Sequence, residues 1–233
     1  MIVAGCDVGS TAGKVVILKD GKILSSSIVP NEPLSDVTAS NAMEKALAGT
    51  GLAQKDMRCI IGTGYGRIEI PFARKIVTEI ACHGKGAHWA NKQARTVIDV
   101  GGQDAKVIKV DAEGVVKDFV LNDKCAAGTG KFLETMCRIL DIKLEEMGEM
   151  SLKAQNAVEI SSQCSVFAES EVVSLIAEKK SVIDILAGIN HSVANRLISM
   201  LYRIGIEEAV VISGGVAKNI GVVRMIEDKI KVK

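Results

Sequence analysis

Residues 7–15 read DVGSTAGKV, and residues 99–107 repeat this pattern without a gap as DVGGQDAKV. In each copy a short apolar strand is predicted just before the aspartate, and a second strand is predicted to begin at the aligned lysine, Lys14 or Lys106. A pattern that recurs within one chain indicates a duplicated structural unit. The two stretches therefore predict two copies of one strand–turn–strand unit.

A third strand is predicted after each copy. Asp20-Gly21 is a strong signal for a two-residue hairpin, and an apolar strand follows it at residues 23–29. A looser turn at residues 111–114 leads to the counterpart strand at residues 115–121. Each copy is therefore expected to form three antiparallel strands.

Helical spacing dominates much of the remaining chain. Helices are predicted at residues 37–47 and 185–204, and apolar residues three and four apart mark one buried face of the second helix. A buried strand at residues 209–212 runs into the turn SGG at residues 213–215, and residues 229–232 are expected to form a last strand. Duplicated strand units that alternate with helices predict an α/β protein of two lobes, residues 1–94 and 95–233, around a cleft.

Composition narrows the class of protein. The chain has 29 basic and 28 acidic residues, and a net charge of +1 gives no long-range field to attract nucleic acid or an anionic membrane. The N-terminus lacks a basic region, and its apolar run breaks at Asp7, far short of the roughly 20 residues of a membrane span. The six cysteines are scattered, so reduced thiols are expected. A cytoplasmic protein is predicted.

The two Asp-x-Gly turns are suited to bind a nucleoside triphosphate. Small residues let backbone N–H groups face the phosphates, and Asp7 and Asp99 would offer carboxylate oxygens to phosphate-bound Mg²⁺. The other expected phosphate contacts are Gly9, Ser10, Thr11, Gly101 and Gly102. Gly214 and Gly215, at a strand end that opens toward a helix, are expected to hold the remaining phosphates or the nucleoside.

Gln103 and Asp104, at the tip of the second turn, are candidates for positioning the attacking water. A single Asp-x-Gly turn is more often only a hairpin, but two aligned copies and the glycine pair favour the nucleotide. No P-loop sequence is present, and no dinucleotide fingerprint follows the first strand. The arrangement resembles the phosphate-1, phosphate-2 and adenosine motifs of the acetate and sugar kinase, heat-shock chaperone and actin superfamily, which implies a duplicated actin-like, ribonuclease H-like ATPase fold.

Four further stretches make the resemblance more specific. They are TGYGR at residues 63–67, residues 98–106, NDKCAAGTG at residues 122–130, and SSQCSVFAESE at residues 161–171. They are similar to the activator ATPases of 2-hydroxyacyl-CoA dehydratases and the related benzoyl-CoA reductase ATPase subunits, of the BadF/BadG/BcrA/BcrD type. The similarity runs from residue 1 to about residue 224.

The resemblance implies a homodimer with one [4Fe–4S] cluster on its two-fold axis, ligated by Cys125 and Cys164 of each subunit. The chain has no CxxC pair, and a two-fold axis turns two cysteines into the four thiolates that a cubane cluster needs. Helical spacing after each cysteine predicts that each precedes a helix, whose positive end would face the cluster. Cys137 falls inside the first of these helices and is expected to be structural.

The activity that the resemblance implies is ATP-driven electron transfer. ATP or ADP with Mg²⁺ would close the lobes, shift the cysteine-bearing helices and pass one electron to a partner dehydratase or reductase. Reduced ferredoxin or flavodoxin would supply that electron, in anaerobic metabolism. The resemblance also implies a closing helix that has no counterpart before Lys233.

Two other functions share the same turns. A small-molecule kinase of the superfamily would need a substrate pocket with its own general base, and the cysteine motifs count against it. A nucleotide-gated assembly or chaperone protein would close its lobes without redox chemistry. Arg67 and Glu79 are either solvated surface residues or partner contacts.

Overall fold

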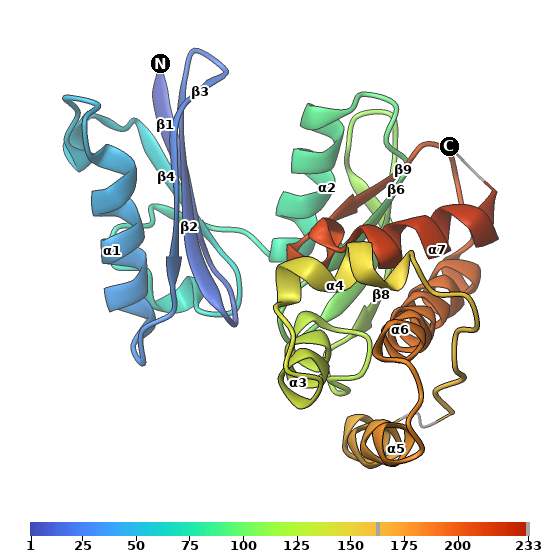
Figure 1. Cartoon of the computed structure of the whole chain (residues 1–233). Coiled ribbons are helices and arrows are strands. Elements are labelled where there is room, and N and C mark those ends of the chain that lie inside the picture. Colours follow the sequence, from blue (N-terminus) through green and yellow to red (C-terminus); the bar gives the residue numbers. More distant parts are fainter. Residues whose placement is uncertain (162–163, 232–233) are drawn as a thin grey trace. The chain divides into compact units, whose positions relative to one another are not determined.

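A computed structural model of the 233-residue chain describes residues 1–161 and 164–231 (Figure 1). Two compact units make up the chain, Met1–Cys82 and His83–Lys233. The change of unit falls inside a helix, earlier than the lobe boundary expected after residue 94, which stays a prediction. No helix of the described residues is long and apolar enough to cross a membrane.

The first unit contains a five-stranded sheet with the order β3-β2-β1-β4-β5. Its strands are β1 (Ile2–Val8), β2 (Ala12–Lys19), β3 (Lys22–Pro30), β4 (Cys59–Thr63) and β5 (Lys75–Ile76). The β2–β3 hairpin turns at Asp20 and Gly21, whose φ angles of 52° and 78° fit the predicted two-residue turn. Helix α1 (Ser35–Leu47) buries a face of small residues, mostly alanine, against this sheet. Two single-turn helices, η1 (Gln54–Asp56) and η2 (Arg67–Glu69), complete the unit.

The second unit contains a four-stranded sheet with the order β8-β7-β6-β9. Its strands are β6 (Thr96–Val100), β7 (Ala105–Val110), β8 (Val116–Asn122) and β9 (Val210–Ser213). In both sheets the first three strands of the unit form an antiparallel meander, and a fourth strand pairs in parallel with the first of them. The orders β3-β2-β1-β4 and β8-β7-β6-β9 are therefore equivalent, and the predicted duplication is confirmed at the level of topology.

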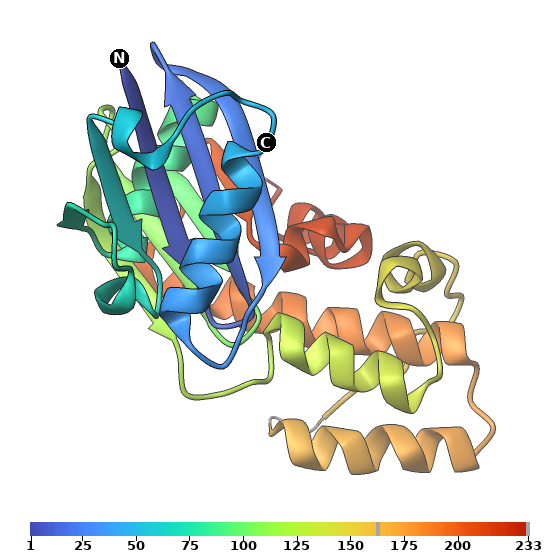
Figure 2. The same cartoon turned by 90° about the vertical axis from the view of Figure 1, so that its left-hand side faces the viewer.

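Six helices and a single-turn helix accompany the second sheet. They are α2 (Glu79–Ala90), α3 (Gly130–Ile139), α4 (Leu144–Ser151), α5 (Ser165–Ala177), α6 (Val182–Ile204), η3 (Gly215–Lys218) and α7 (Ile220–Ile230). Helix α6 forms the centre of the core: Ile185, Ile189 and Val193 are fully buried on its predicted face. Figure 2 shows α3, α5 and α6 side by side, with α5 on the outer side of the layer.

The α/β class and most predicted elements are confirmed, but β4, β5 and α4 were not predicted, and two further differences concern the last strand and α2. The expected strand at residues 229–232 is wrong, because Lys229 and Ile230 end α7, whose apolar residues Val222 and Ile226 continue a helical spacing into that segment. Val232 lies outside the described residues. Helix α2 was not predicted, since two glycines within it, Gly84 and Gly86, lower its intrinsic helix propensity.

Candidate functional site

The first turn of the repeat joins β1 to β2 and is closed by a hydrogen bond from Gly9 N to Ala12 O at 3.1 Å. Asp7 lies opposite Lys14 in the antiparallel register, and Lys14 Nζ donates to Asp7 Oδ2 at 2.9 Å. The predicted contacts Ser10 and Thr11 lie in this turn and are at least partly exposed. The structure thus keeps the first group of predicted residues together at one strand end.

The residues after β4 pack onto the first turn. Thr63 is the parallel neighbour of Asp7, and Gly64 follows it with a φ of 88°. A Cβ at Gly64 would lie 2.2 Å from Asp7 Oδ1 and 2.4 Å from Val8 O, so only glycine fits here. The hydroxyl of Thr63 is buried and has no hydrogen-bond partner among the described residues. A buried donor beside Asp7 is a polar group that a bound phosphate or metal-bound water would satisfy.

The second turn, between β6 and β7, places Asp99 in a buried polar cluster. Asp99 is 3% exposed, and Lys106 Nζ lies 3.5 Å from its Oδ2 and 2.7 Å from Asp104 Oδ2. Ser213 donates to Asp99 Oδ1 at 3.0 Å, and His83 Nε2 lies 3.3 Å from Asp99 Oδ2. Both carboxylate oxygens of Asp99 are therefore engaged, and Lys106 is shared by two carboxylates.

Gln103 and Asp104 lie at the surface of the second turn. Gln103 is exposed, and Asp104 is half-buried through its bond to Lys106. Asp7 is likewise more accessible than Asp99. Asp7 is thus the accessible carboxylate of the first turn and Asp104 that of the second, whereas Asp99 is held in a fixed orientation by its neighbours.

The strand ends β4 and β9 extend the duplication beyond the sequence repeat. Ser213 pairs with Asp99 as Thr63 pairs with Asp7, and the next residue, Gly214, has a φ of 85°. A Cβ at Gly214 would lie 2.2 Å from Val100 O, which matches the contact of Gly64 with Val8 O. Gly215 has open space where a Cβ would be. Gly214 is therefore required by the fold itself, whereas Gly215 leaves room for a ligand.

A buried amide network fixes the segment after Gly215. Asn219 caps α7 by accepting hydrogen bonds from Gly221 N at 3.0 Å and Val222 N at 3.2 Å. Its side chain donates to Asn190 Oδ1 at 3.0 Å, and Asn190 in turn donates to Ser151 Oγ at 2.8 Å. The start of α7 is thereby tied to α4 and α6, as expected for a strand end that opens toward a helix.

Helix α3 is built directly onto the second turn. Gly130 N donates to Gly101 O at 2.9 Å, and Lys131 N donates to Gly102 O at 2.8 Å. The carbonyl groups of the two glycines thus face the first turn of α3. The loop that contains Cys125 leads into this helix, so the second turn and the cysteine loop are joined through α3.

Cys125 and Cys164 each precede a helix, as predicted. Cys125 is half-buried in the loop before α3, and its carbonyl oxygen accepts from Asn122 Nδ2 at 3.1 Å. Cys164 is exposed and is the N-cap residue of α5. Ser162 and Gln163, in the predicted stretch before it, lie outside the described residues. Across the described residues, no group of three or more His, Cys, Asp or Glu side chains is placed to hold a metal.

Cys137 differs from these two cysteines. It is buried inside α3, where its Sγ lies 3.6 Å from Met147 Sδ. Burial, with a smaller contribution from Glu145, raises the pKa of Cys137 to about 11. A protonated, enclosed thiol is a poor metal ligand, which agrees with the structural role expected for it.

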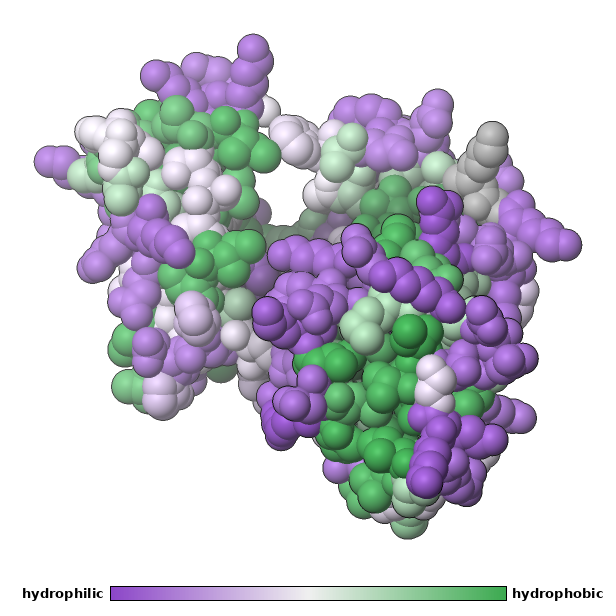
Figure 3. Space-filling view, viewed as in Figure 1, coloured by the Kyte–Doolittle hydropathy of each residue, from purple (hydrophilic) through white to green (hydrophobic). Residues whose placement is uncertain are grey.

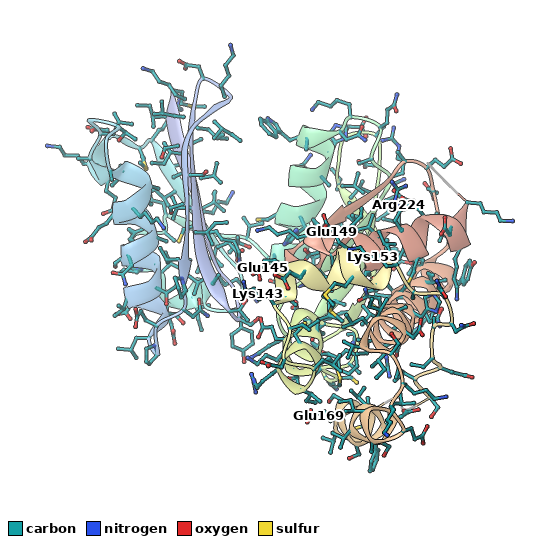
Figure 4. The ribbon with its side chains drawn as sticks, in the orientation of Figure 1. Lys143, Glu145, Glu149, Lys153, Glu169 and Arg224 are labelled. Atoms are coloured by element: carbon teal, nitrogen blue, oxygen red, sulfur yellow. The ribbon has the colours of Figure 1, made fainter. Side chains whose placement is uncertain are left out.

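Helix α5 exposes apolar residues on its outer face. Val166 is 64% exposed and Phe167 is 68% exposed, while Ala168 and Val172 are buried on the inner face. Figure 3 shows apolar residues gathered where α5 lies in Figure 1. Charges of both signs lie on and beside α4: Figure 4 labels Glu145 and Glu149 within the helix and Lys143 and Lys153 outside its two ends. Such a mixed face gives no single-sign patch, and the apolar face of α5 is the more distinctive surface.

Four side chains that contact the predicted aspartates were not predicted from the sequence. Lys14 contacts Asp7, and Lys106, His83 and Ser213 contact Asp99. The two lysines occupy aligned positions of the repeat, and a lysine seven residues after each aspartate was the signal that could have revealed them. His83 and Ser213 reach Asp99 from a helix and a parallel strand. Arg67 and Glu79, considered as surface residues, form an ion pair at 3.2 Å with both side chains partly buried.

Residues 4–233 match the BadF/BadG/BcrA/BcrD ATPase family. The chain is 47% identical over 228 residues to the 2-hydroxyisocaproyl-CoA dehydratase activator of Clostridioides difficile, which covers 96% of this chain and 84% of that protein. It is 43% identical over 230 residues to the (R)-2-hydroxyglutaryl-CoA dehydratase activating ATPase of Acidaminococcus fermentans, with 98% and 88% covered.

Solved structures give the same result. The activator of the 2-hydroxyisocaproyl-CoA dehydratase from Clostridium difficile with bound ADPNP superposes with a TM-score of 0.94 at 45% identity, covering 100% of this chain and 87% of that one. A glucokinase of the ROK family from Streptomyces griseus shares the fold alone, with a TM-score of 0.57 at 14% identity, covering 99% and 89%. The protein is thus an ATPase with the actin-like fold of the sugar kinases. It belongs to the BadF/BadG/BcrA/BcrD ATPase family, and ATP is its nucleotide.

Proposed function

We propose that this protein is the ATP-hydrolysing activator of a 2-hydroxyacyl-CoA dehydratase, to which it delivers one electron at a time. The observation that carries the proposal is the pair of hydrogen bonds from the start of α3 to Gly101 and Gly102, because it joins a phosphate turn to a cysteine loop. Two relatives at 43–47% identity, a dehydratase activator and a dehydratase activating ATPase, support the same activity. A benzoyl-CoA reductase-type enzyme is the alternative partner.

In this proposal the nucleotide binds through the duplicated turns. The phosphates are held by backbone N–H groups and hydroxyls of Gly9, Ser10, Thr11, Gly101 and Gly102. Gly214 and Gly215 lie next to the nucleoside. Mg²⁺ is held through Asp7, with its Lys14 partner limiting the negative charge. Asp99 orients the second turn, and Gln103 and Asp104 position the attacking water.

Cys125 and Cys164 are the proposed ligands of one [4Fe–4S] cluster in a homodimer. The exposed thiol at the start of α5 and the half-buried thiol in the loop before α3 fit half of a four-thiolate site that a second copy completes. The exposed apolar face of α5, next to Cys164, suits contact with that second copy. When bound, such a cluster supplies one-electron transfer, with reduced ferredoxin or flavodoxin as the proposed donor.

Coupling between the two sites follows from the contacts of α3. A phosphate that pulls on the N–H groups of the second turn also moves the carbonyls of Gly101 and Gly102, to which Gly130 and Lys131 are bonded. The first turn of α3 must then follow, and the loop of Cys125 with it. By linkage, a change at the cysteine loop alters nucleotide affinity by the same free energy.

Anaerobic purification tests the proposal. We expect a brown dimer with about four iron atoms, ATP hydrolysis, and an electron paramagnetic resonance signal of the reduced protein that changes on addition of MgATP. The Asp7→Asn variant should keep its iron and lose hydrolysis, because Asp7 lies outside the cysteine-bearing unit. An iron-free protein, or a signal unchanged by nucleotide that demonstrably binds, would contradict the activator role.

A further inference from the structure

We propose that Glu79 and His83, on one face of α2, are positioning residues that link the two aspartates of the nucleotide site. The inference rests on the proposed function, since it assigns these residues to the same ATP site. Glu79 and His83 are four residues apart in a helix and therefore project from the same side. Neither residue belongs to the sequence repeat or to the glycine turns.

At the start of α2, Glu79 is connected to the surroundings of Asp7. Arg67 Nη1 donates to Glu79 Oε2 at 3.2 Å and to Gly64 O at 2.9 Å. Gly64 is the residue whose missing Cβ lets the β4 turn lie against Asp7 Oδ1. A shift of α2 at Glu79 is thus transmitted through one guanidinium to the turn that packs on Asp7.

One helical turn later, His83 reaches Asp99. Its Nε2 lies 3.3 Å from Asp99 Oδ2, on the carboxylate whose other oxygen is bound by Ser213. Asp99 is almost completely buried, so His83 is one of a small set of groups that fix its orientation. The imidazole is about one-third exposed, so it is not enclosed by packing and can shift when the helix shifts.

The next residue shows how the part of α2 that begins at His83 packs on the second sheet. Gly84 packs so closely on the sheet that a Cβ would lie 3.0 Å from Val110 and 3.1 Å from Val116. Helix α2 therefore carries His83 with the second sheet, while its first turn is attached to the Gly64 turn by the Arg67–Glu79 pair. A displacement of α2 at one attachment is carried along the helix to the other, so α2 would make the orientations of Asp7 and Asp99 depend on each other.

Steady-state ATP hydrolysis by the dimer tests the role of His83. We expect His83→Phe to lower kcat by about tenfold or more with KM changed less than about threefold, because orientation of a reacting group affects the transition state more than binding. His83→Gln, whose amide can replace Nε2, should recover most of kcat. Equal losses in both variants, or no loss in His83→Phe, would overturn the proposal.

A double-mutant cycle tests the link through α2. We expect Glu79→Gln to lower kcat as well. The double variant Glu79→Gln/His83→Phe should be no slower than the slower single variant, because both substitutions break the same connection through α2. Strictly multiplicative effects would overturn the link. Lys85→Gln is the matched control: Lys85 is on the same helix but donates to Glu113 O, and its loss should leave kcat unchanged.

The outcome for wild-type protein separates this inference from the proposed function. If the wild-type dimer does not hydrolyse ATP, the proposed function fails. If it hydrolyses ATP and the cycle is multiplicative, the activator role stands and the role of α2 fails. Circular dichroism of each variant checks that the helical content is retained.

Discussion

Lys14 and Asp7 face each other across β1 and β2, and Lys106 and Asp99 repeat this pair across β6 and β7. The two pairs differ in environment: the side chain of Lys14 is 42% exposed, whereas that of Lys106 is 4% exposed and serves both Asp99 and Asp104. Duplication thus produced one solvated ion pair and one triad of charges in which Lys106 and Asp99 are buried and Asp104 is partly exposed. Their contributions to stability should differ accordingly.

We expect Lys106→Met to destabilise the protein by about 3–5 kcal/mol, because it removes the buried cation beside the buried carboxylate of Asp99. Lys14→Met should cost about 0–1 kcal/mol, as is usual for exposed pairs. Urea denaturation of each variant, followed by circular dichroism, measures the free energy of unfolding. Equal costs would show that the burial of the second pair has no energetic consequence.

Iron content tests the ligand assignment. Cys125→Ala and Cys164→Ala should each remove the cluster from the whole dimer, since each variant leaves two thiolates for four positions. Cys137→Ala should keep its iron and lose only modest stability, because Cys137 is a buried apolar contact of Met147. Colorimetric iron and sulfide assays on anaerobic protein distinguish these results. Similar iron loss in all three variants would refute the assignment.

Thiol reactivity gives an independent test on iron-free, reduced protein. Burial, followed by the charge of Asp7, raises the pKa of Cys6 to about 12, and burial raises that of Cys137 to about 11. At pH 8 fewer than about one in a thousand of these thiols is ionised, so iodoacetamide should spare both. Exposed Cys164 should be alkylated, and Cys6 and Cys137 should become reactive in urea. Labelling of Cys137 before Cys164 would contradict the structure.

Adjacent glycines of the β9 turn should respond differently to substitution. Gly214→Ala places a Cβ within 2.2 Å of Val100 O at a φ of 85°, so we expect a loss of folding stability. Gly215→Val enters open space and should leave the thermal midpoint nearly unchanged while weakening ATP binding at least about tenfold. Calorimetric titration and thermal melts measure the two effects.

Gly86→Ala is the control. Gly86 lies on α2 and, like Gly215, has open space where a Cβ would be, so this variant should keep both the ATP affinity and the thermal midpoint of the wild type. Tight ATP binding by Gly215→Val would exclude Gly215 from the nucleotide site.

Local pattern was sufficient to predict the duplicated meanders, since Asp-x-Gly turns and apolar strands are encoded by neighbouring residues. It could not predict that Ser213 bonds to Asp99, because the two residues are 114 positions apart and meet only through parallel pairing of β6 and β9. Helix α2 was missed because its two glycines weaken the local preference, and packing of Gly84 on the sheet stabilises it instead. The strand expected at residues 229–232 was wrong because this short segment alone resembles a strand, whereas the spacing of Val222 and Ile226 before it continues a helix.

The two turns also differ in what binds their carbonyl groups. Gly9 O accepts from the exposed side chain of Asn31 at 2.8 Å, whereas Gly101 O and Gly102 O accept from the main chain of α3. A side chain can rotate away by itself, but the first-turn amides of α3 can leave the second turn only if the start of the helix moves relative to it. The amide protons of Gly130 and Lys131 are therefore natural reporters of the second turn, and their rates of deuterium exchange will record how often that turn opens in each nucleotide state.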